Sequence, residues 1–220
     1  RAREADILLT SRAPLSAATI ARLPRLKFIN LLSTAYNIVD LPAARARGIP
    51  VAHVPSYGTD AVAEFVFALL LNFHRQAERH SELARAGEWA RSLAWSFWRT
   101  PQAELAGRTL GIVGFGRIGR RVGKLAAAFR MPVLAYAPRQ SSPPAYPFEW
   151  RSSVREVFAE SDVVSLHCNL TPENRGFVDR RLLQCMKPTA YLINTARGAL
   201  VNEADLAAAL AARELAVAAL

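Results

Sequence analysis

Short apolar runs alternate with helix-like stretches over the first 54 residues of the chain. The pattern predicts strands at 6–10, 26–32 and 49–54, with helices at 16–23 and 38–47 between them. Strands that alternate with helices in this way form a parallel sheet, because each return to the sheet needs a crossover connection. We therefore expect a first α/β lobe of flavodoxin-like type.

A longer helical pattern follows at 59–80, with Thr59 as a suitable N-cap residue. Its apolar positions share one helix face: Ala61, Phe65, Leu69 and Phe73. A second helical piece is expected to end at Trp89. It leads into the segment 89–98, which is too aromatic for a solvated linker unless something covers it. The segment either packs on its own domain or forms a subunit interface, and the sequence favours neither.

The pattern beyond residue 108 predicts a second and larger lobe. The expected strands lie at 109–113, 132–136, 163–167 and 191–194, and the expected helices at 118–129, 153–160, 180–186 and from Glu203 onward. Such an order is typical of a doubly wound sheet. The predicted class is thus α/β with two Rossmann-like parallel-sheet domains: residues 1–57 as a partial substrate domain, and residues 58–220 as a dinucleotide-binding domain led by an inter-domain helix.

Composition favours a cytoplasmic globular protein. Hydrophobic residues make up 51% of the 220 residues and charged residues 21%, and no apolar run is long enough for a membrane span or a signal peptide. Cys168 and Cys185 lack the spacing of metal ligands, so we expect no metal site. The net charge of +10 suggests nucleic-acid binding, but the arginines come in twos and threes over unrelated segments. We expect no nucleic-acid partner.

A glycine fingerprint lies between the first predicted strand and helix of the second lobe. It reads Gly114-Phe115-Gly116-Arg117-Ile118-Gly119. The first glycine permits a tight turn, the second lets a pyrophosphate approach the backbone, and the third allows close strand–helix packing. The free amides at the helix start also favour an anion. This strand–turn–helix setting predicts dinucleotide binding through Gly114, Gly116 and Gly119.

The residues after the following strand bear on the choice of cofactor. A site for NAD usually places a carboxylate there to bind the ribose hydroxyls, but Ala137-Pro138-Arg139-Gln140-Ser141 stands in its place. A cation with hydroxyl donors suits a 2′-phosphate, so Arg139 and Gln140 predict NADP as cofactor. The alternative is that Arg139 is a solvated loop residue and that the site accepts NAD.

Several further segments carry a resemblance to a known family. They are Tyr57 to Glu64, Arg85 to Trp89, the glycine fingerprint, Ser165 to Asn174, and Ile193 to Gly198. Together they make the chain resemble the D-isomer-specific 2-hydroxyacid dehydrogenases, especially glycerate dehydrogenases and hydroxypyruvate or glyoxylate reductases. The resemblance covers nearly the whole chain. It implies hydride transfer between NAD(P)H and a small 2-oxo acid or D-2-hydroxy acid.

The resemblance also implies individual roles. Arg197 is the catalytic arginine that binds the substrate carboxylate, and a bidentate guanidinium there can also help to polarise the neighbouring carbonyl. Ala35 and Tyr36 match the segment that holds this carboxylate with backbone amides, and Thr34 beside them contacts the cofactor. The other implied cofactor contacts are Arg117, Ile118, Cys168, Asn169, Asn174, Thr195 and Ala196. The chain departs from the family at Ala35, where glycine is usual, and at Asn169, where proline is common.

Acid–base chemistry is expected outside this sequence. In the family it belongs to a His supported by a Glu, and both lie downstream of the alanine-rich segment 215–220. We therefore read the chain as a fragment without its last sheet strands, inactive as it stands, and do not assign His167 as the base. His53, His74 and His80 are expected to be structural or solvated.

Two further interpretations stay open at this stage. Family members are commonly homodimers, so a homodimer is expected. The alternative function is a dinucleotide-sensing, corepressor-like interaction protein of the same superfamily, in which cofactor binding controls assembly.

Overall fold

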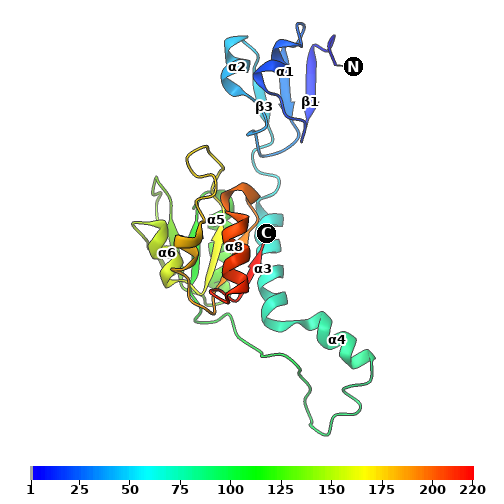
Figure 1. Cartoon of the computed structure of the whole chain (residues 1–220), viewed down its shortest axis with the longest axis vertical. Coiled ribbons are helices and arrows are strands. Elements are labelled where there is room, and N and C mark those ends of the chain that lie inside the picture. Colours follow the sequence, from blue (N-terminus) through cyan, green and yellow to red (C-terminus); the bar gives the residue numbers. More distant parts are fainter. Residues whose placement is uncertain (1) are drawn as a thin grey trace. The chain divides into compact units, whose positions relative to one another are not determined.

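The computed structural model describes residues 2–220, in two compact units: one ends at Gly58 and the other starts at Thr59 (Figure 1). The first unit consists of β1 (Ile7–Thr10), α1 (Ala17–Ala21), β2 (Phe28–Leu31), α2 (Leu41–Ala46) and β3 (Val51–His53). Its strands are all parallel, in the order β1-β2-β3. The side chains of Ser16 and Asp40 cap the two helices. The predicted βαβαβ lobe is confirmed.

The second unit contains a six-stranded parallel sheet. Its strands are β4 (Leu110–Val113), β5 (Val133–Tyr136), β6 (Phe148–Trp150), β7 (Val163–Leu166), β8 (Tyr191–Asn194) and β9 (Val217–Ala219). Their spatial order is β6-β5-β4-β7-β8-β9, which is the 3-2-1-4-5-6 order of a doubly wound dinucleotide fold. The strand order reverses between β4 and β7. In such sheets ligands bind at the carboxyl ends of the strands beside this switch point.

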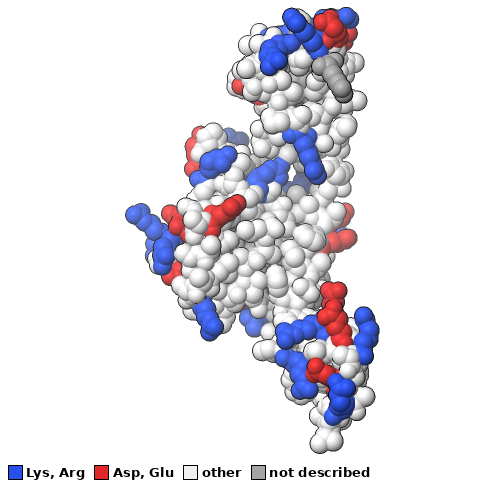
Figure 2. All heavy atoms as spheres, turned by 45° about the vertical axis from the view of Figure 1, so that its right-hand side comes forward, with Lys and Arg blue, Asp and Glu red and all other residues white. Residues whose placement is uncertain are grey.

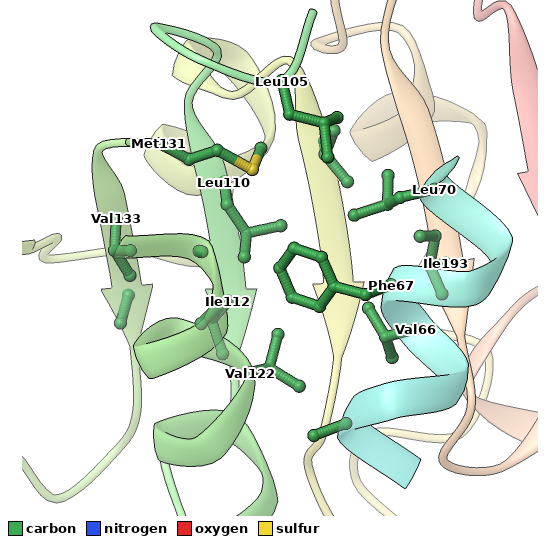
Figure 3. Packing of buried hydrophobic residues seen from close by; sticks show 14 of the residues in the cluster. Val66, Phe67, Leu70, Leu105, Leu110, Ile112, Val122, Met131, Val133 and Ile193 are labelled. Atoms are coloured by element: carbon green, nitrogen blue, oxygen red, sulfur yellow. The ribbon is translucent and has the colours of Figure 1, made fainter. Parts of the chain in front are cut away.

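Helices cover both faces of this sheet. Side chains of α3 (Thr59–Arg75) and α5 (Arg117–Ala128) pack on one face, where Phe67 and Leu70 meet Leu110 and Ile112 of β4 (Figure 3). The opposite face packs against α6 (Val154–Glu160), α7 (Arg180–Leu183) and α8 (Glu203–Ala211). Alternate residues of each strand thus enter different cores. This double burial explains why the strands read as continuous apolar runs.

The structure corrects the predicted elements in three places. The helix expected over 59–80 ends at Arg75, because Gln76 adopts a left-handed conformation with φ of 43°, and α4 (Ala77–Arg85) begins after it. The second helical piece also ends before Trp89. The short strands β6 and β9 were not predicted. β9 pairs with β8 and so adds one strand to the sheet beyond those that were predicted.

The aromatic segment 89–98 is largely exposed. Leu93 and Trp95 are 106% and 94% exposed, whereas Trp89 stacks on Phe97 at 6.4 Å between ring centroids. His80 stabilises this segment, because its Nε2 accepts a hydrogen bond from the amide of Arg99 at 3.1 Å. Packing within the second unit therefore buries only part of the segment 89–98.

The distribution of charged, metal-binding and apolar side chains gives no further candidate site among the described residues. Basic and acidic side chains lie close to one another at several places on the surface shown in Figure 2. Among residues 2–220, no set of three or more His, Cys, Asp and Glu side chains is placed to hold a metal ion. Over the same range no helix has the length and apolar character needed to cross a membrane. Both cysteines are free and half-buried.

Candidate dinucleotide and substrate site

The glycine turn after β4 is tightly packed on one side and open on the other. Gly114 has a φ of +95°, and a β-carbon there would lie 2.5 Å from the amide nitrogen of Cys168. A β-carbon at Gly119 would lie 2.3 Å from the carbonyl oxygen of Gly114, whereas one at Gly116 would meet nothing within 4 Å. Gly116 caps α5, whose first-turn amides have no partners within the helix. The open side therefore fits an anion such as a pyrophosphate.

An aromatic platform supports the same turn. Phe115 is buried against Phe148 and Trp150, with ring centroids 4.7 and 5.4 Å away. The guanidinium of Arg120, one turn into α5, lies 5.0 Å from the Phe115 ring centroid. It also donates hydrogen bonds to Ser141 Oγ and, at 2.6 Å, to the carbonyl oxygen of Ser142. Arg120 thus ties the loop after β5 to the glycine turn.

The loop after β5 presents polar side chains to solvent. β5 runs beside β4, and the amide of Gly114 donates to the carbonyl of Tyr136 at 2.9 Å. The chain then continues into Arg139 and Gln140, both exposed. No carboxylate occurs between residues 137 and 148. The local charge at this edge of the sheet is therefore positive.

The carboxyl end of β7 lies against the glycine turn. The amide of His167 donates to the carbonyl of Val113 at 2.8 Å, and its Nε2 lies 2.8 Å from Ser165 Oγ. Burial lowers the pKa of His167 to about 4, and it raises the pKa of the neighbouring Cys168 thiol. A neutral imidazole that bonds within its own strand packs beneath the site and is unsuited to act as an acid.

Asn174 and Asn169 shape the loop that follows. Asn174 Oδ1 accepts from the amide of Thr171, and Asn174 Nδ2 donates to the carbonyl of Asn169, both at 2.7 Å. Both polar atoms of the Asn174 side chain are used within the loop. The geometry therefore gives this residue a part in holding the loop conformation.

The carboxyl end of β8 holds Thr195, Ala196 and Arg197. Thr195 Oγ1 is buried and has no hydrogen-bond partner within the described chain. Arg197 is half-buried, and its Nη1 donates to the carbonyl of Ala196 at 2.6 Å. Sequence reasoning missed Asn194, whose buried side chain bonds the backbone of this turn. The sequence feature that could have identified Asn194 is a polar residue at the end of an otherwise apolar strand.

Thr34, Ala35 and Tyr36 lie in the first unit, in the loop between β2 and α2. His53 Nδ1 lies 3.1 Å from the carbonyl of Thr34, and the His53 ring packs edge-on against Tyr36 at 5.6 Å between centroids. Ser33 Oγ donates to the carbonyl of Ala35 at 2.9 Å. These contacts shape the loop and leave Tyr36 42% exposed.

The remaining histidines have structural surroundings. His74 is buried, with its Nδ1 3.0 Å from the carbonyl of Leu70 and its ring edge-on to Tyr191. Burial lowers its pKa. His80 holds the aromatic segment as described above. The structural interpretation of both residues agrees with these contacts.

The match to a family model adds the deciding observation. Residues 67–220 match the model for the NAD binding domain of the D-isomer specific 2-hydroxyacid dehydrogenases. The chain belongs to this family. The resemblance noted in the sequence is thereby confirmed, as is the predicted α/β fold.

Several known proteins are similar to almost the whole chain. A hydroxypyruvate reductase of Blautia hydrogenotrophica is 39% identical over 100% of this chain and 68% of its own length. A D-lactate dehydrogenase of Aquifex aeolicus, solved with NAD and lactic acid, is 30% identical with a TM-score of 0.88, over 99% of this chain and 64% of that one. An acyclic imino acid reductase solved with NADPH and D-Arg is 30% identical with a TM-score of 0.85, over 97% and 67%. The chain thus spans about two thirds of the length of these relatives.

The acidity of His167 leads to a pH prediction. Its pKa of about 4 in the folded protein lies below the ordinary value of 6.5. Its neutral form therefore supports full stability above pH 6.5, and stability is lost as the pH falls from 6.5 toward 4. The difference corresponds to at most about 3 kcal/mol of unfolding free energy. We expect His167→Gln to flatten this part of the stability curve measured by urea unfolding. Parallel curves for the two proteins between pH 4 and 6.5 would contradict it.

Proposed function

We propose that the protein is an oxidoreductase that transfers a hydride between NAD(P)H and a small 2-oxo acid or D-2-hydroxy acid of the hydroxypyruvate, glyoxylate and D-glycerate class. The observation that carries the proposal is Arg197, placed at the carboxyl end of β8 in a doubly wound dinucleotide sheet. A 2-oxo acid presents a carboxylate beside its reacting carbonyl, and a guanidinium can bind that carboxylate with two parallel hydrogen bonds. Arg197 then orients the substrate and helps to polarise the carbonyl.

For the cofactor we propose NADP, with NAD as the alternative. The domain is an NAD-binding one by family, and the two solved relatives hold NAD in one case and NADPH in the other. Arg139, Gln140 and Ser141 offer a cation and polar donors where an NAD site would place a carboxylate. Arg120 adds a second cation and holds Ser141 in place. The bound nicotinamide supplies or accepts the hydride.

The remaining residues bind and orient. The amides after Gly116, with Arg117 and Ile118, face the pyrophosphate. Cys168, Asn169 and Asn174 line the adenine side, and Thr195 with Ala196 lies by the nicotinamide, where the unpaired Thr195 Oγ1 is available to a polar group. Ala35 and Tyr36 offer backbone amides to the substrate carboxylate, and Thr34 contacts the cofactor. The Ser33–Ala35 hydrogen bond supports that loop conformation.

The direct test of this function is an absorbance assay at 340 nm. NADPH and NADH are each mixed with hydroxypyruvate, glyoxylate or 3-phosphohydroxypyruvate, using the gene product at its natural length. We expect fast NADPH consumption with hydroxypyruvate or glyoxylate. Measurable NADPH binding without turnover on any 2-oxo acid would reject the dehydrogenase and favour the dinucleotide-sensing alternative.

The preference for NADP predicts an asymmetric effect of Arg139→Ala. Loss of one charge-assisted hydrogen bond to a phosphate should raise the Kd of NADPH by about 30-fold. The Kd of NADH should change less than about twofold, because NADH lacks that phosphate. Arg85→Ala on α4 removes the same charge far along the chain and serves as control. Equal weakening of both nucleotides would reject the assignment.

We also propose a homodimer that covers the aromatic segment 89–98. Leu93 and Trp95 are fully exposed, and large apolar side chains left close together in water are typical of an interaction surface. The double variant Leu93→Ser with Trp95→Ser should sediment as a monomer at a concentration where the unchanged protein sediments as a dimer. Tyr57→Ser, also at an exposed aromatic residue, is the control. A monomeric unchanged protein would refute the proposal.

A further inference from the structure

Asn194 is the last residue of β8, and its side chain is 5% exposed. Its Oδ1 accepts hydrogen bonds from the amides of Ala196 at 3.0 Å and Arg197 at 3.3 Å. Its Nδ2 donates to the carbonyl of Arg197 at 2.8 Å. A carboxamide is the side chain that both accepts and donates at this reach. The Asn194 side chain therefore fixes Arg197 at its amide and at its carbonyl.

The anchor itself is held rigidly. Asn194 pairs with Leu166 of β7, and its neighbours Leu192 and Ile193 are fully buried. On the far side of the turn, the carbonyl of Arg197 also accepts from the amide of Leu200 at 3.1 Å. The backbone of Arg197 is thus held between the end of the sheet and the short 3-10 helix Gly198–Leu200.

The same hydrogen bonds reach the guanidinium through one peptide plane. The amide of Arg197 and the carbonyl of Ala196 belong to the same planar peptide unit and point in opposite directions. Asn194 Oδ1 binds the amide, and Arg197 Nη1 donates to the carbonyl at 2.6 Å. The orientation of this peptide therefore sets where the guanidinium is held.

We propose that Asn194 is a positioning residue that orients the guanidinium of Arg197 for the substrate carboxylate, by fixing the Ala196–Arg197 peptide. The inference rests on the proposed function, because it takes Arg197 as the carboxylate-binding group. Preorganisation is the physical gain: a long, flexible arginine binds its partner more tightly when its backbone and its first contact are already fixed.

The test variant is Asn194→Asp, which keeps the shape but places a carboxylate against the carbonyl of Arg197 and loses the donor. We expect the KM for the 2-oxo acid to rise by about 30-fold and the Kd of NADPH to stay within about twofold. In the Arg197→Ala background the same change should add less than about twofold, because the guanidinium it orients is gone. Exchange of the Arg197 amide proton should accelerate in Asn194→Ala, which removes the Oδ1 that accepts from this amide.

Asn202 provides the matched control. Asn202 lies in the same unit, directly before α8, and its Oδ1 caps this helix by accepting from the amide of Asp205 at 3.2 Å. Asn202→Ala should lower the free energy of unfolding by about 1 kcal/mol without a selective rise in the KM for the 2-oxo acid. The comparison distinguishes a variant that only loses stability from one in which the Arg197 guanidinium is no longer oriented.

Two results would overturn the positioning role. One is an unchanged KM in Asn194→Asp, and the other is a full additional loss when that change is added to Arg197→Ala. If the unchanged protein turns over no 2-oxo acid, the proposed function fails by itself. The hydrogen-bond clamp is then judged by amide exchange in Asn194→Ala, which removes the acceptor of the Arg197 amide, and an unaltered exchange rate at Arg197 in that variant would reject it.

Discussion

Replacement of Arg197 by alanine is expected to lower kcat/KM for hydroxypyruvate by about 10³-fold, which corresponds to roughly 4 kcal/mol of transition-state stabilisation. The variant loses the two hydrogen bonds that a guanidinium gives to the substrate carboxylate, and it also loses polarisation of the neighbouring carbonyl. Steady-state kinetics with NADPH in excess measure the effect. The Kd of NADPH, measured by fluorescence, should stay within about threefold, because Arg197 binds the substrate and not the nucleotide.

Arg197→Lys tests whether a positive charge alone is sufficient at this position. It keeps the charge but cannot make the paired, planar contact, so it should recover only part of the lost rate, about tenfold over the alanine variant. Equal activity of the lysine variant and the unchanged protein would mean that charge alone is required. Full activity of the alanine variant would remove the observation on which the proposed function stands.

Gly114→Ala is expected to lower the free energy of unfolding by about 3 kcal/mol or more. The φ of +95° at this position is strained for any residue with a β-carbon, and the new atom would lie 2.5 Å from the amide nitrogen of Cys168. The backbone atoms of His167 and Cys168, directly after β7, cannot move aside as a flexible side chain could. Urea unfolding measures the loss, and nucleotide binding should fall with it because the glycine turn moves.

Substitutions at two other glycines distinguish the effect of backbone strain on stability from the effect of a new β-carbon on ligand binding. Gly176→Ala introduces a β-carbon at a φ of +66° into open space, so only the conformational cost of about 1 kcal/mol is expected. Gly116→Ala should leave stability within about 0.5 kcal/mol but weaken NADPH binding at least tenfold, since its β-carbon would lie on the open side of the turn. Unweakened binding in Gly116→Ala would show that the pyrophosphate lies elsewhere.

Local sequence signals were sufficient where a residue's role depends on its immediate neighbours. The glycine fingerprint could be recognised because three glycines at fixed spacing meet requirements of one turn, and Gly114 and Gly119 do lie against atoms that leave no room for a β-carbon. The apolar runs predicted the central strands, because burial on both faces demands apolar side chains at successive positions. Arg197 could be named because its motif is short and contiguous.

Signals failed where a neighbour distant in sequence decides the outcome. β6 and β9 are three-residue edge strands that exist because β5 and β8 offer free edges, and an isolated triplet such as Val217–Ala219 carries little strand signal of its own. The sequence over 59–80 predicts one continuous helix, yet the chain turns at Gln76 in a left-handed conformation. A glycine at this position would have indicated the turn, but the residue is a glutamine. Asn194 reads as an ordinary polar residue at the end of a strand, because its bonds to Ala196 and Arg197 depend on the conformation of the turn that follows.

The sequence by itself determined the fold class, the family and the residues of the glycine turn, because each depends on composition, period or contiguous motif. Only the tertiary structure decided that Arg120 ties Ser141 and Phe115 together, that His167 is desolvated beneath the site, and that Asn194 holds Arg197. These depend on distances between atoms of different elements. A linear pattern of polar and apolar residues does not encode such distances, because hydrogen bonding and burial are properties of the packed chain.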